Sequence, residues 1–231
     1  MKARGNNLPY RIREGKNKME PLLFADWYTD PFCSWSYAAE GPIGIFRRHF
    51  GERLSFRYRL LPLYRNIDEF LKHHGMTKQQ EFAPRIGKVS RATGVTMSPK
   101  VWETGQAPQS SEECCLFAEA ALLADPVKGG TFLSRLRELA FLEGRNIGNP
   151  DILLETAIAL GLDRGRLEEF LRSGAAMAAL SEDQEKARSE GVTVRPTLIM
   201  TNSEGDRVFI GGLRNPDLFI LAGESLIREA S

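Results

Sequence analysis

Residues 22–36 read LLFADWYTDPFCSWS and combine the features of a strand, a tight turn and the start of a helix. Residues 22–28 form a short, mostly apolar run, as expected of a central strand that is buried on both faces. Thr29-Asp30-Pro31 then breaks the strand. Cys33 follows at once, where the next helix is expected to begin. The segment therefore predicts a cysteine between the end of a buried strand and the start of a helix.

The residues after this cysteine complete a β-α-β unit. One face of a helix is marked by apolar residues at helical spacing: Ala39, Ile43, Phe46 and Phe50. Gly51 ends this helix, and the Gly41-Pro42 pair predicts a kink in its first half. Over residues 54–60 apolar residues alternate with polar ones, which predicts a strand whose wet face carries Ser55, Arg57 and Arg59.

Residues 66–190 are helical in pattern almost throughout. Ser110 and Glu113 form a capping-box pattern at the start of one helix. Asn149, followed by Pro150, and Asp163 are expected N-caps of two others. The interior of this segment is therefore predicted to be a bundle of amphipathic helices.

The strand pattern returns after residue 190. Residues 197–200 and 207–210 read as a hairpin around a turn at 202–206, and a last helix starts at Asn215-Pro216. The prediction is one α/β domain, built from residues 19–65 and 191–231 and interrupted by a helical insertion over 66–190. Residues 1–18 are basic without an apolar pattern and are expected to be a flexible lead-in.

Composition limits the classes of function. A net charge of +1 provides no field that would favour nucleic acid as a partner. No apolar run reaches the roughly 18–20 residues that cross a bilayer, and the polar N-terminus does not resemble a secretory signal. We therefore expect a cytoplasmic protein without a membrane or nucleic-acid partner, unless a natural leader is missing. Three cysteines and three scattered histidines predict neither a disulfide framework nor a metal site.

Cys33 is the first candidate for chemistry. The backbone N–H groups and dipole at a helix start stabilise an anion, so we expect a lowered thiol pKa and a stronger nucleophile. Ser36 stands three residues later, where a C-x-x-C motif has its second thiol. A serine cannot close an internal disulfide, but its hydroxyl can donate a hydrogen bond to a thiolate. The pattern thus favours mixed disulfides with an external partner.

Cys114 and Cys115 lie within one predicted helix. A disulfide between neighbours demands strained geometry and does not suit a helix interior. We expect Cys114 to pack in the core and Cys115 to be partly exposed. Cys115 is the candidate if Cys33 has a resolving partner within the chain, although we do not expect one.

Val194-Arg195-Pro196-Thr197 precedes the third predicted strand, where a proline owes no ladder bond. Together with Asp30-Pro31-Phe32-Cys33-Ser34-Trp35-Ser36 and the helical insertion, this loop resembles the DsbA-like thioredoxin superfamily. Within it the chain is most similar to FrnE-type oxidoreductases, whose active site resembles D-P-x-C-P-W-C. Kappa-class glutathione transferases and 2-hydroxychromene-2-carboxylate isomerases are also similar, with serine at the nucleophile position.

The resemblance implies a thioredoxin fold, with a central mixed sheet and a large all-helical insertion. It also implies that Cys33 is the attacking thiol and that Pro196 is cis and lies against it. The backbone of Arg195 would then pair with an extended peptide or glutathione, with Ser34 and Trp35 completing the substrate contacts. The Arg195 cation lowers the pKa of Cys33 or binds a substrate carboxylate; a solvated side chain is the equal alternative.

Three functions remain open at this point. The first is thiol–disulfide exchange or isomerisation through one cysteine, with protein disulfides or glutathione as partners. Ser36 and Ser34 depart from the family pattern and argue against a simple dithiol oxidase. The second is a glutathione-dependent transferase or isomerase of a small organic molecule, and the third is a non-catalytic adaptor. We expect no resident cofactor, with glutathione as a co-substrate, and leave a homodimer open.

Overall fold

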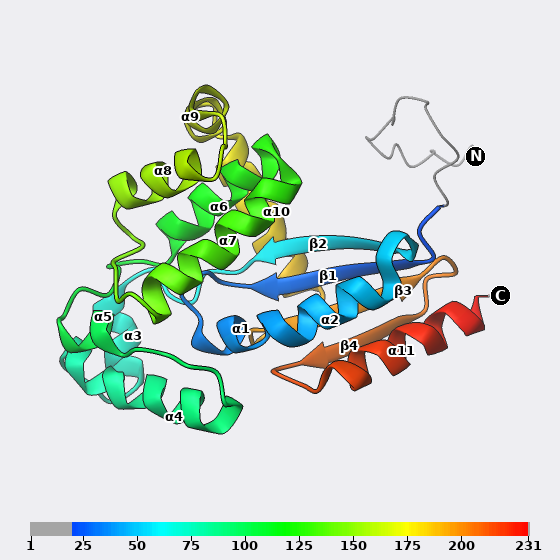
Figure 1. Cartoon of the computed structure of the whole chain (residues 1–231), viewed down its shortest axis with the longest axis horizontal. Helices are drawn as coiled ribbons and strands as arrows, with labels where there is room; N and C mark the ends of the chain where they lie inside the picture. The colour runs from blue at the N-terminus through cyan, green and yellow to red at the C-terminus, as the bar shows by residue number, and fades with distance from the viewer. Residues whose placement is uncertain (1–19, 231) are drawn as a thin grey trace.

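The computed structural model describes residues 20–230, and the predicted lead-in over 1–18 lies outside them (Figure 1). Within that range four strands form one sheet in the order β2-β1-β3-β4. These strands are β1 Leu23–Thr29, β2 Leu54–Leu60, β3 Thr197–Asn202 and β4 Arg207–Gly211. β1 runs parallel to β2 and antiparallel to β3, which pairs with β4 as a hairpin. The predicted mixed sheet is confirmed.

The helix after Cys33 is broken in two. α1 spans Ser34–Ala38 and α2 spans Glu40–Phe50, with Ala39 between them. Pro42 has no N–H to donate to the carbonyl four residues earlier, which explains the break beside the predicted kink. Gly51 ends α2 with a φ of 53°, and the short 3-10 helix η1 (Gly51–Arg53) leads into β2.

Between β2 and β3 every regular element is helical. The elements are α3 Ile67–His73, the 3-10 helix η2 Gln79–Phe82, α4 Ala83–Thr93, α5 Lys100–Glu103, α6 Glu112–Ala124, α7 Pro126–Phe141, α8 Pro150–Ala159, α9 Arg164–Arg172 and α10 Ala175–Ser189. α11, Pro216–Glu229, closes the chain. The fold class is therefore a thioredoxin fold with a helical insertion, as expected. The predicted boundaries at 65/66 and 190/191 fall in connections, and the division into parts stays a prediction.

Helix caps follow the sequence with one exception. The side chains of Asn149, Asp163 and Asn215 accept hydrogen bonds from the first turns of α8, α9 and α11. The capping box of Ser110 with Glu113 is wrong. α6 begins at Glu112 with Ser111 as its N-cap, one residue later than the predicted box requires. The Ser110 hydroxyl accepts from the Glu112 N–H, and the Ser111 hydroxyl accepts the Leu63 N–H at 2.7 Å.

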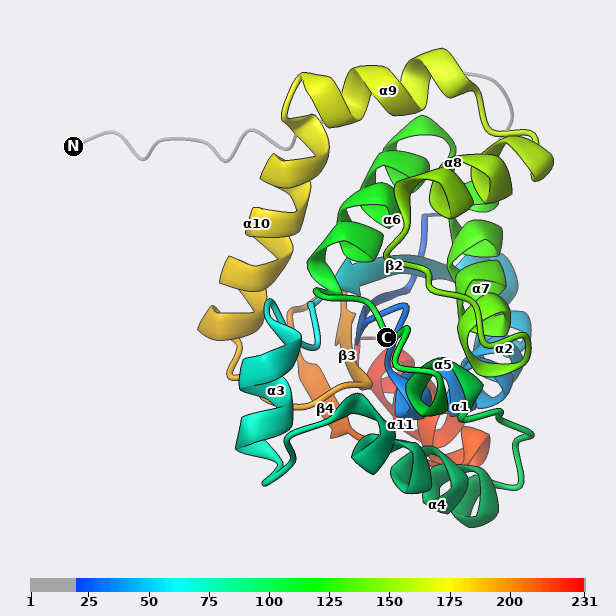
Figure 2. The same ribbon diagram turned by 90° about the vertical axis from the view of Figure 1, so that its left-hand side faces the viewer.

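The two faces of the sheet are covered by different helices. α2 and α11 pack on one face over an apolar cluster that includes Trp27, Phe46, Met200 and Phe219. α10 lies on the other face, where Ala187 packs with Tyr28 and Ile199 (Figures 1 and 2). A larger cluster joins the remaining helices to Phe32 and Leu60, at the ends of the first two strands. The insertion is thus built against the end of the sheet that carries Cys33.

One position on β2 differs from its predicted environment. Arg57 is exposed as expected, but Arg59 is only 9% exposed. Its guanidinium donates to Asp26 Oδ1 at 2.9 Å and to Asp183 Oδ1 at 2.8 Å. The alternation failed because α10 covers that face of the strand and supplies Asp183.

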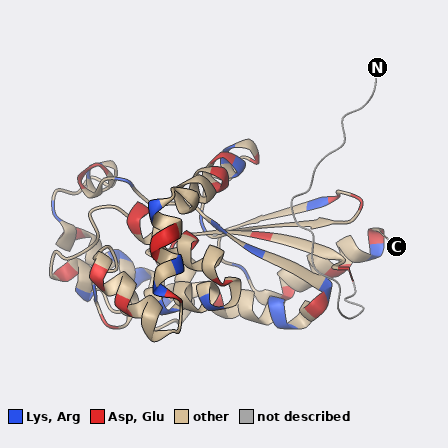
Figure 3. Cartoon of the chain, turned by 90° about the horizontal axis from the view of Figure 1, so that it is seen from above, with Lys and Arg blue, Asp and Glu red and all other residues tan. Residues whose placement is uncertain are grey.

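Charged side chains of both signs are interspersed along the helices (Figure 3). Among residues 20–230, no helix has both the length and the apolar composition that a membrane span requires. The same residues contain no group of three or more His, Cys, Asp or Glu side chains placed to hold a metal ion.

Candidate active site

Cys33 is the N-cap residue of α1 and is 4% exposed. Its backbone N–H donates to the Asp30 carbonyl at 3.3 Å, and its own carbonyl accepts the Tyr37 N–H at 2.9 Å. These two bonds tie the cysteine to the turn before it and to the first turn of the helix after it. The predicted place of Cys33 between β1 and a helix is confirmed.

The Arg195–Pro196 loop lies next to this cysteine. Residue 28 of β1 pairs with Thr197 of β3, so the residues before Thr197 meet those that follow β1. The Arg195–Pro196 peptide bond is cis, as the family resemblance implied. Cys33 Sγ lies 3.9 Å from the carbonyl oxygen of Arg195. No group within residues 20–230 accepts a hydrogen bond from the Arg195 N–H, which leaves that donor free for a ligand.

The side chains of the cysteine turn divide into inward and outward groups. Ser36 is buried, and its hydroxyl has no hydrogen-bond partner among the described residues. Ser34 is half-buried and Trp35 is 42% exposed, so the indole lies at the surface beside the thiol. Such an arrangement holds one hydroxyl in reserve for a thiolate and presents one aromatic surface to a substrate.

The pKa of the Cys33 thiol is raised, so the predicted lowering is wrong. Burial is the largest cause, because it removes water from the thiolate, and the negative charge of Asp30 adds to it. The Ser36 hydroxyl and the Arg195 cation act in the opposite direction. The Ser36 backbone N–H, in the first turn of α1, also lowers the pKa, but together these contributions do not outweigh burial.

Asp30 is a member of the site that was not among the predicted site residues; in the sequence it marked the break after β1 and opened the motif that carries the family resemblance. It is fully buried, and its carboxylate accepts the Phe32 N–H at 2.5 Å and the Leu63 N–H at 2.6 Å. Burial raises the pKa of Asp30, although the Arg195 cation and these hydrogen bonds oppose the rise. The only signal was its place before proline, where an aspartate commonly bonds the backbone two residues on.

Arg195 turns inward and does not extend into solvent. Its Nη2 donates to the Pro62 carbonyl at 3.0 Å, and its Nε is buried without a partner among the described residues. The cation lowers the pKa of both Cys33 and Asp30. The solvated alternative is therefore wrong, and a role in tuning the thiol is supported.

Cys114 and Cys115 are both fully buried free thiols, so the predicted partial exposure of Cys115 is wrong. α6 is the central helix of the insertion and packs against α7, α9 and α10, which bury more than one of its faces. Cys115 Sγ lies 3.6 Å from Asp30 Oδ2. Burial and the charge of Asp30 raise the pKa of the Cys115 thiol well above its ordinary value.

The described part of the chain thus brings together one thiol and five groups that act on it. Cys33 faces a backbone carbonyl and a free N–H of the cis-proline loop. A spare hydroxyl and a cation favour its thiolate, while burial and a carboxylate oppose it. The predicted site residues Ser34, Trp35, Ser36, Arg195 and Pro196 all lie around it.

Comparison with known proteins places this geometry in context. The Thioredoxin_5 family, described as thioredoxin, matches residues 27–219. A ClpXP adapter protein SpxH of Bacillus subtilis is 26% identical over 178 residues, which cover 77% of this chain and 58% of that protein. The chain therefore spans less than two thirds of this relative's length.

Solved structures show the same fold. The cytosolic disulfide reductase DsbM of Pseudomonas aeruginosa aligns with a TM-score of 0.70 and 21% identity, over 89% of this chain and 99% of that one. It has also been solved with glutathione. A 2-hydroxychromene-2-carboxylate isomerase aligns with a TM-score of 0.56 and 15% identity, over 90% of this chain and 96% of its own.

Proposed function

This chain belongs to the thioredoxin family, and from that premise we propose that it exchanges thiols and disulfides through Cys33 alone. The observation that carries the proposal is the position of Cys33 Sγ, 3.9 Å from the Arg195 carbonyl of a cis-proline loop. The same loop leaves the Arg195 N–H free for a ligand. Ser36 replaces the second thiol, so the product is a mixed disulfide.

The reaction has two exchange steps. The Cys33 thiolate attacks one sulfur of an external disulfide, a new S–S bond forms, and the other sulfur leaves as a thiolate that takes a proton from water. An external thiolate, such as that of glutathione, then attacks the adduct. It bonds to the substrate sulfur and restores the Cys33 thiolate, so electrons balance without a further oxidant.

The surrounding residues favour these steps in different ways. The Ser36 hydroxyl, unpartnered in the resting protein, donates to the Cys33 thiolate when that thiolate forms or leaves. The free Arg195 N–H pairs with the backbone of a peptide or of glutathione, and Trp35 packs against it. The raised pKa of Cys33 keeps the thiol mostly protonated, so reaction is slow until a substrate is docked.

Glutathione as co-substrate and a cytosolic location belong to the same proposal. Their support is the likeness in fold to a protein described as a cytosolic disulfide reductase, which has been solved with glutathione. Thiol exchange that needs an external reductant fits a compartment where such a thiol is abundant.

The test is a disulfide reduction assay with glutathione as the reductant, using an unstructured protein that carries one disulfide. Cys33→Ala is expected to lose the activity of the wild type, while Cys115→Ala, the matched control for a buried thiol, retains it. Equal activity of wild type and Cys33→Ala would show that Cys33 takes no part in the reaction.

A second candidate is an adaptor without redox chemistry. It is favoured by the small exposure of Cys33, 4%, and by the raised pKa of its thiol. The SpxH relative is named an adapter protein. This function predicts that Cys33 forms no adduct with oxidised glutathione while the protein is folded, which separates it from thiol exchange.

A further inference from the structure

The outer edge of β2 is a free sheet edge. β2 is the outermost strand of the sheet and lies next to β1. The Arg53 carbonyl and the Leu61 N–H point toward β1, because they bond Leu22 N–H and Thr29 O. In a parallel pair every second residue faces the partner, so Phe56 and Tyr58 direct their backbone groups outward. Leu60 N–H, in the same phase, bonds Asp183 Oδ2 at 2.6 Å. The open edge thus ends where α10 begins to cover the strand.

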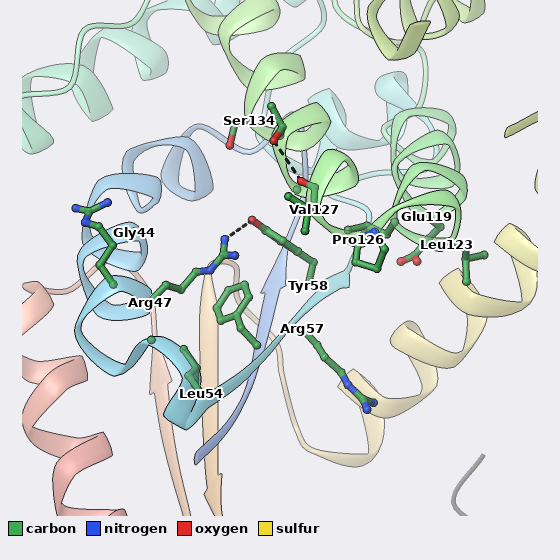
Figure 4. A pocket seen from close by; sticks show the side chains of 16 residues that line it. Gly44, Arg47, Leu54, Arg57, Tyr58, Glu119, Leu123, Pro126, Val127 and Ser134 are labelled. Atoms are coloured by element: carbon green, nitrogen blue, oxygen red, sulfur yellow. Dashed lines mark hydrogen bonds between the residues drawn. The ribbon is translucent and has the colours of Figure 1, made fainter. Parts of the chain in front are cut away.

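A groove of about 1030 Å³ follows this edge, between α2 on one side and the α6–α7 turn on the other (Figure 4). The apolar part of its lining is exposed: Val127 is 81% and Leu123 is 39% exposed. Isolated surface apolar residues are common, but these two line the same groove as the unpaired backbone groups of β2. The groove offers both hydrogen-bonding and apolar contacts to one ligand.

The charge in the groove is positive. Arg47, Arg48 and Arg57 line it, are exposed, and form no ion pair with a carboxylate among the described residues. Arg47 Cζ lies 4.6 Å from the centroid of the Phe56 ring, and Nη1 donates to Tyr58 Oη at 2.8 Å. These partners are neutral, so the positive charge stays unmatched.

The acidic residue of the lining does not offset these cations. Glu119 is 6% exposed, and burial together with its neighbour Asp183 raises the pKa of its carboxyl to about 9. Asp183 accepts bonds from Arg59 and Leu60 and is the charged member of the pair, so Glu119 holds the proton. At neutral pH the groove therefore presents three cations and an uncharged acid.

We propose that this groove binds an extended acidic segment of a partner protein as an added strand beside β2. The segment would pair with the outward N–H and C=O groups of Phe56 and Tyr58. Side chains of an added strand alternate between two sides. Arg47 points to one side of β2 and Arg57 to the other, so successive acidic residues would meet cations on both (Figure 4). This surface is separate from the Cys33 site and does not depend on its chemistry.

Protection against aggregation accounts for only part of this surface. Exposed charges on an edge strand discourage unwanted pairing, and Arg57 alone serves that purpose. Protection does not require an open groove with exposed apolar walls, nor the two further arginines on α2, Arg47 and Arg48. A docking site for an acidic strand requires all of them.

The probe is a fluorescein-labelled peptide of Glu-Glu-Val-Val repeats, whose successive Glu side chains point to opposite sides of the strand, measured by polarisation with the full chain. We expect saturable binding that weakens as salt rises, and no binding of the matching peptide of Lys and Val. The double variant Arg48→Glu, Arg57→Glu should weaken binding by about tenfold or more. Arg91→Glu is the matched control, because Arg91 lies over Gly87 on α4 as Arg48 lies over Gly44 on α2, and it should leave binding unchanged.

Backbone pairing is tested on the peptide, without disturbing the fold of the protein. An added strand donates only every second N–H to β2, so N-methylation of one alternating set should abolish binding and methylation of the other set should not. Equal binding of both methylated peptides, equal binding of the lysine peptide, or no saturable binding would overturn the proposal. A dimer in light scattering that is lost in the double variant would also overturn the proposal, because the occupant would then be a second copy of this chain.

Discussion

Cys33 and Cys115 both contact Asp30 but differ in what else surrounds them. The backbone N–H of Cys33 bonds the Asp30 carbonyl, and Cys115 Sγ lies 3.6 Å from Asp30 Oδ2. Both thiols are buried, and Asp30 raises the pKa of both. Only Cys33 has the Ser36 hydroxyl and the Arg195 cation to lower its pKa in return. The two thiols are therefore alike in burial and differ in the groups that favour a thiolate, and this difference is the basis for proposing Cys33 as the reacting cysteine.

The fold explains this difference. Cys33 stands at the end of a strand, where a second loop reaches it, while Cys115 lies within α6 and is covered by neighbouring helices. Under the proposed function, a substrate approaches the first from the surface that Trp35 forms. It can reach the second only if the insertion opens.

The largest expected difference is in the rate of alkylation of the two thiols. In the folded protein Cys33 should react with iodoacetamide about a hundredfold or more faster than Cys115, because Cys115 is enclosed by helices and lacks the groups that favour the Cys33 thiolate. Peptide mapping by mass spectrometry at successive times measures both rates. Unfolding in guanidinium should make them equal; a difference that persists would show that it does not arise from the fold.

Ser36→Ala should slow the alkylation of Cys33 by about tenfold, because a hydrogen bond to a charged group is worth about 1.5–3 kcal/mol. Ser36 gives the largest of the contributions that lower the thiol pKa, and alanine removes the donor. The unpartnered hydroxyl is buried, so its removal should leave thermal stability unchanged or slightly raised. A slower rate together with a clear loss of stability would point instead to a packing role for Ser36.

Asp30→Asn should speed the alkylation of Cys33 several-fold, since it removes the negative charge that opposes the thiolate. The same change weakens the acceptor for the Phe32 and Leu63 N–H groups, at a cost in stability of about 1–3 kcal/mol. Rate measurements on the folded variant and urea unfolding separate the two effects. An unchanged or slower rate would contradict the electrostatic role given to Asp30.

Arg195→Met should slow the alkylation of Cys33 by about threefold, because its cation gives the smallest of the named contributions that lower the thiol pKa. Arg195→Lys keeps the charge and should recover part of the rate. The dependence of rate on pH is the deciding measurement: loss of the cation moves the midpoint to higher pH. A fall in rate with no shift of the midpoint would indicate a steric cause.

Glu119→Gln should leave Cys33 faster in alkylation than Cys115 and should change only the pH dependence of stability. The folded pKa of Glu119, about 9, lies above its ordinary value, so the unfolded chain loses this proton first as pH rises. Its contribution to stability is complete below the ordinary pKa of about 4.3 and is lost progressively toward pH 9. Urea unfolding across this range should show that decline in the wild type and a flatter profile in Glu119→Gln.

The local sequence predicted the elements better than their environments. β1, the helix start at Cys33 and the caps at Asn149 and Asp163 follow from neighbouring residues, and the structure confirms them. The cis bond before Pro196 came from family resemblance, since spacing alone favours trans. Residues that are neighbours in the sequence thus predict where strands, turns and helices begin.

The errors share a physical cause. Arg59 is buried because Asp183, 124 residues later, pairs with it, and no strand periodicity carries that information. Cys115 is buried because several helices enclose α6. The pKa of Cys33 rises because the insertion and Asp30 surround it, against the dipole that its helix start predicts. Each depends on long-range packing.

The central claim, that Cys33 is a working nucleophile in the folded chain, is tested most directly by intact mass after incubation with oxidised glutathione. Thiol exchange predicts one glutathione adduct on the wild type, mapped to Cys33, removed by reduced glutathione and absent from Cys33→Ala. Cys115→Ala should form the same adduct. A folded wild type that forms no adduct, or forms it on Cys115, would contradict the claim.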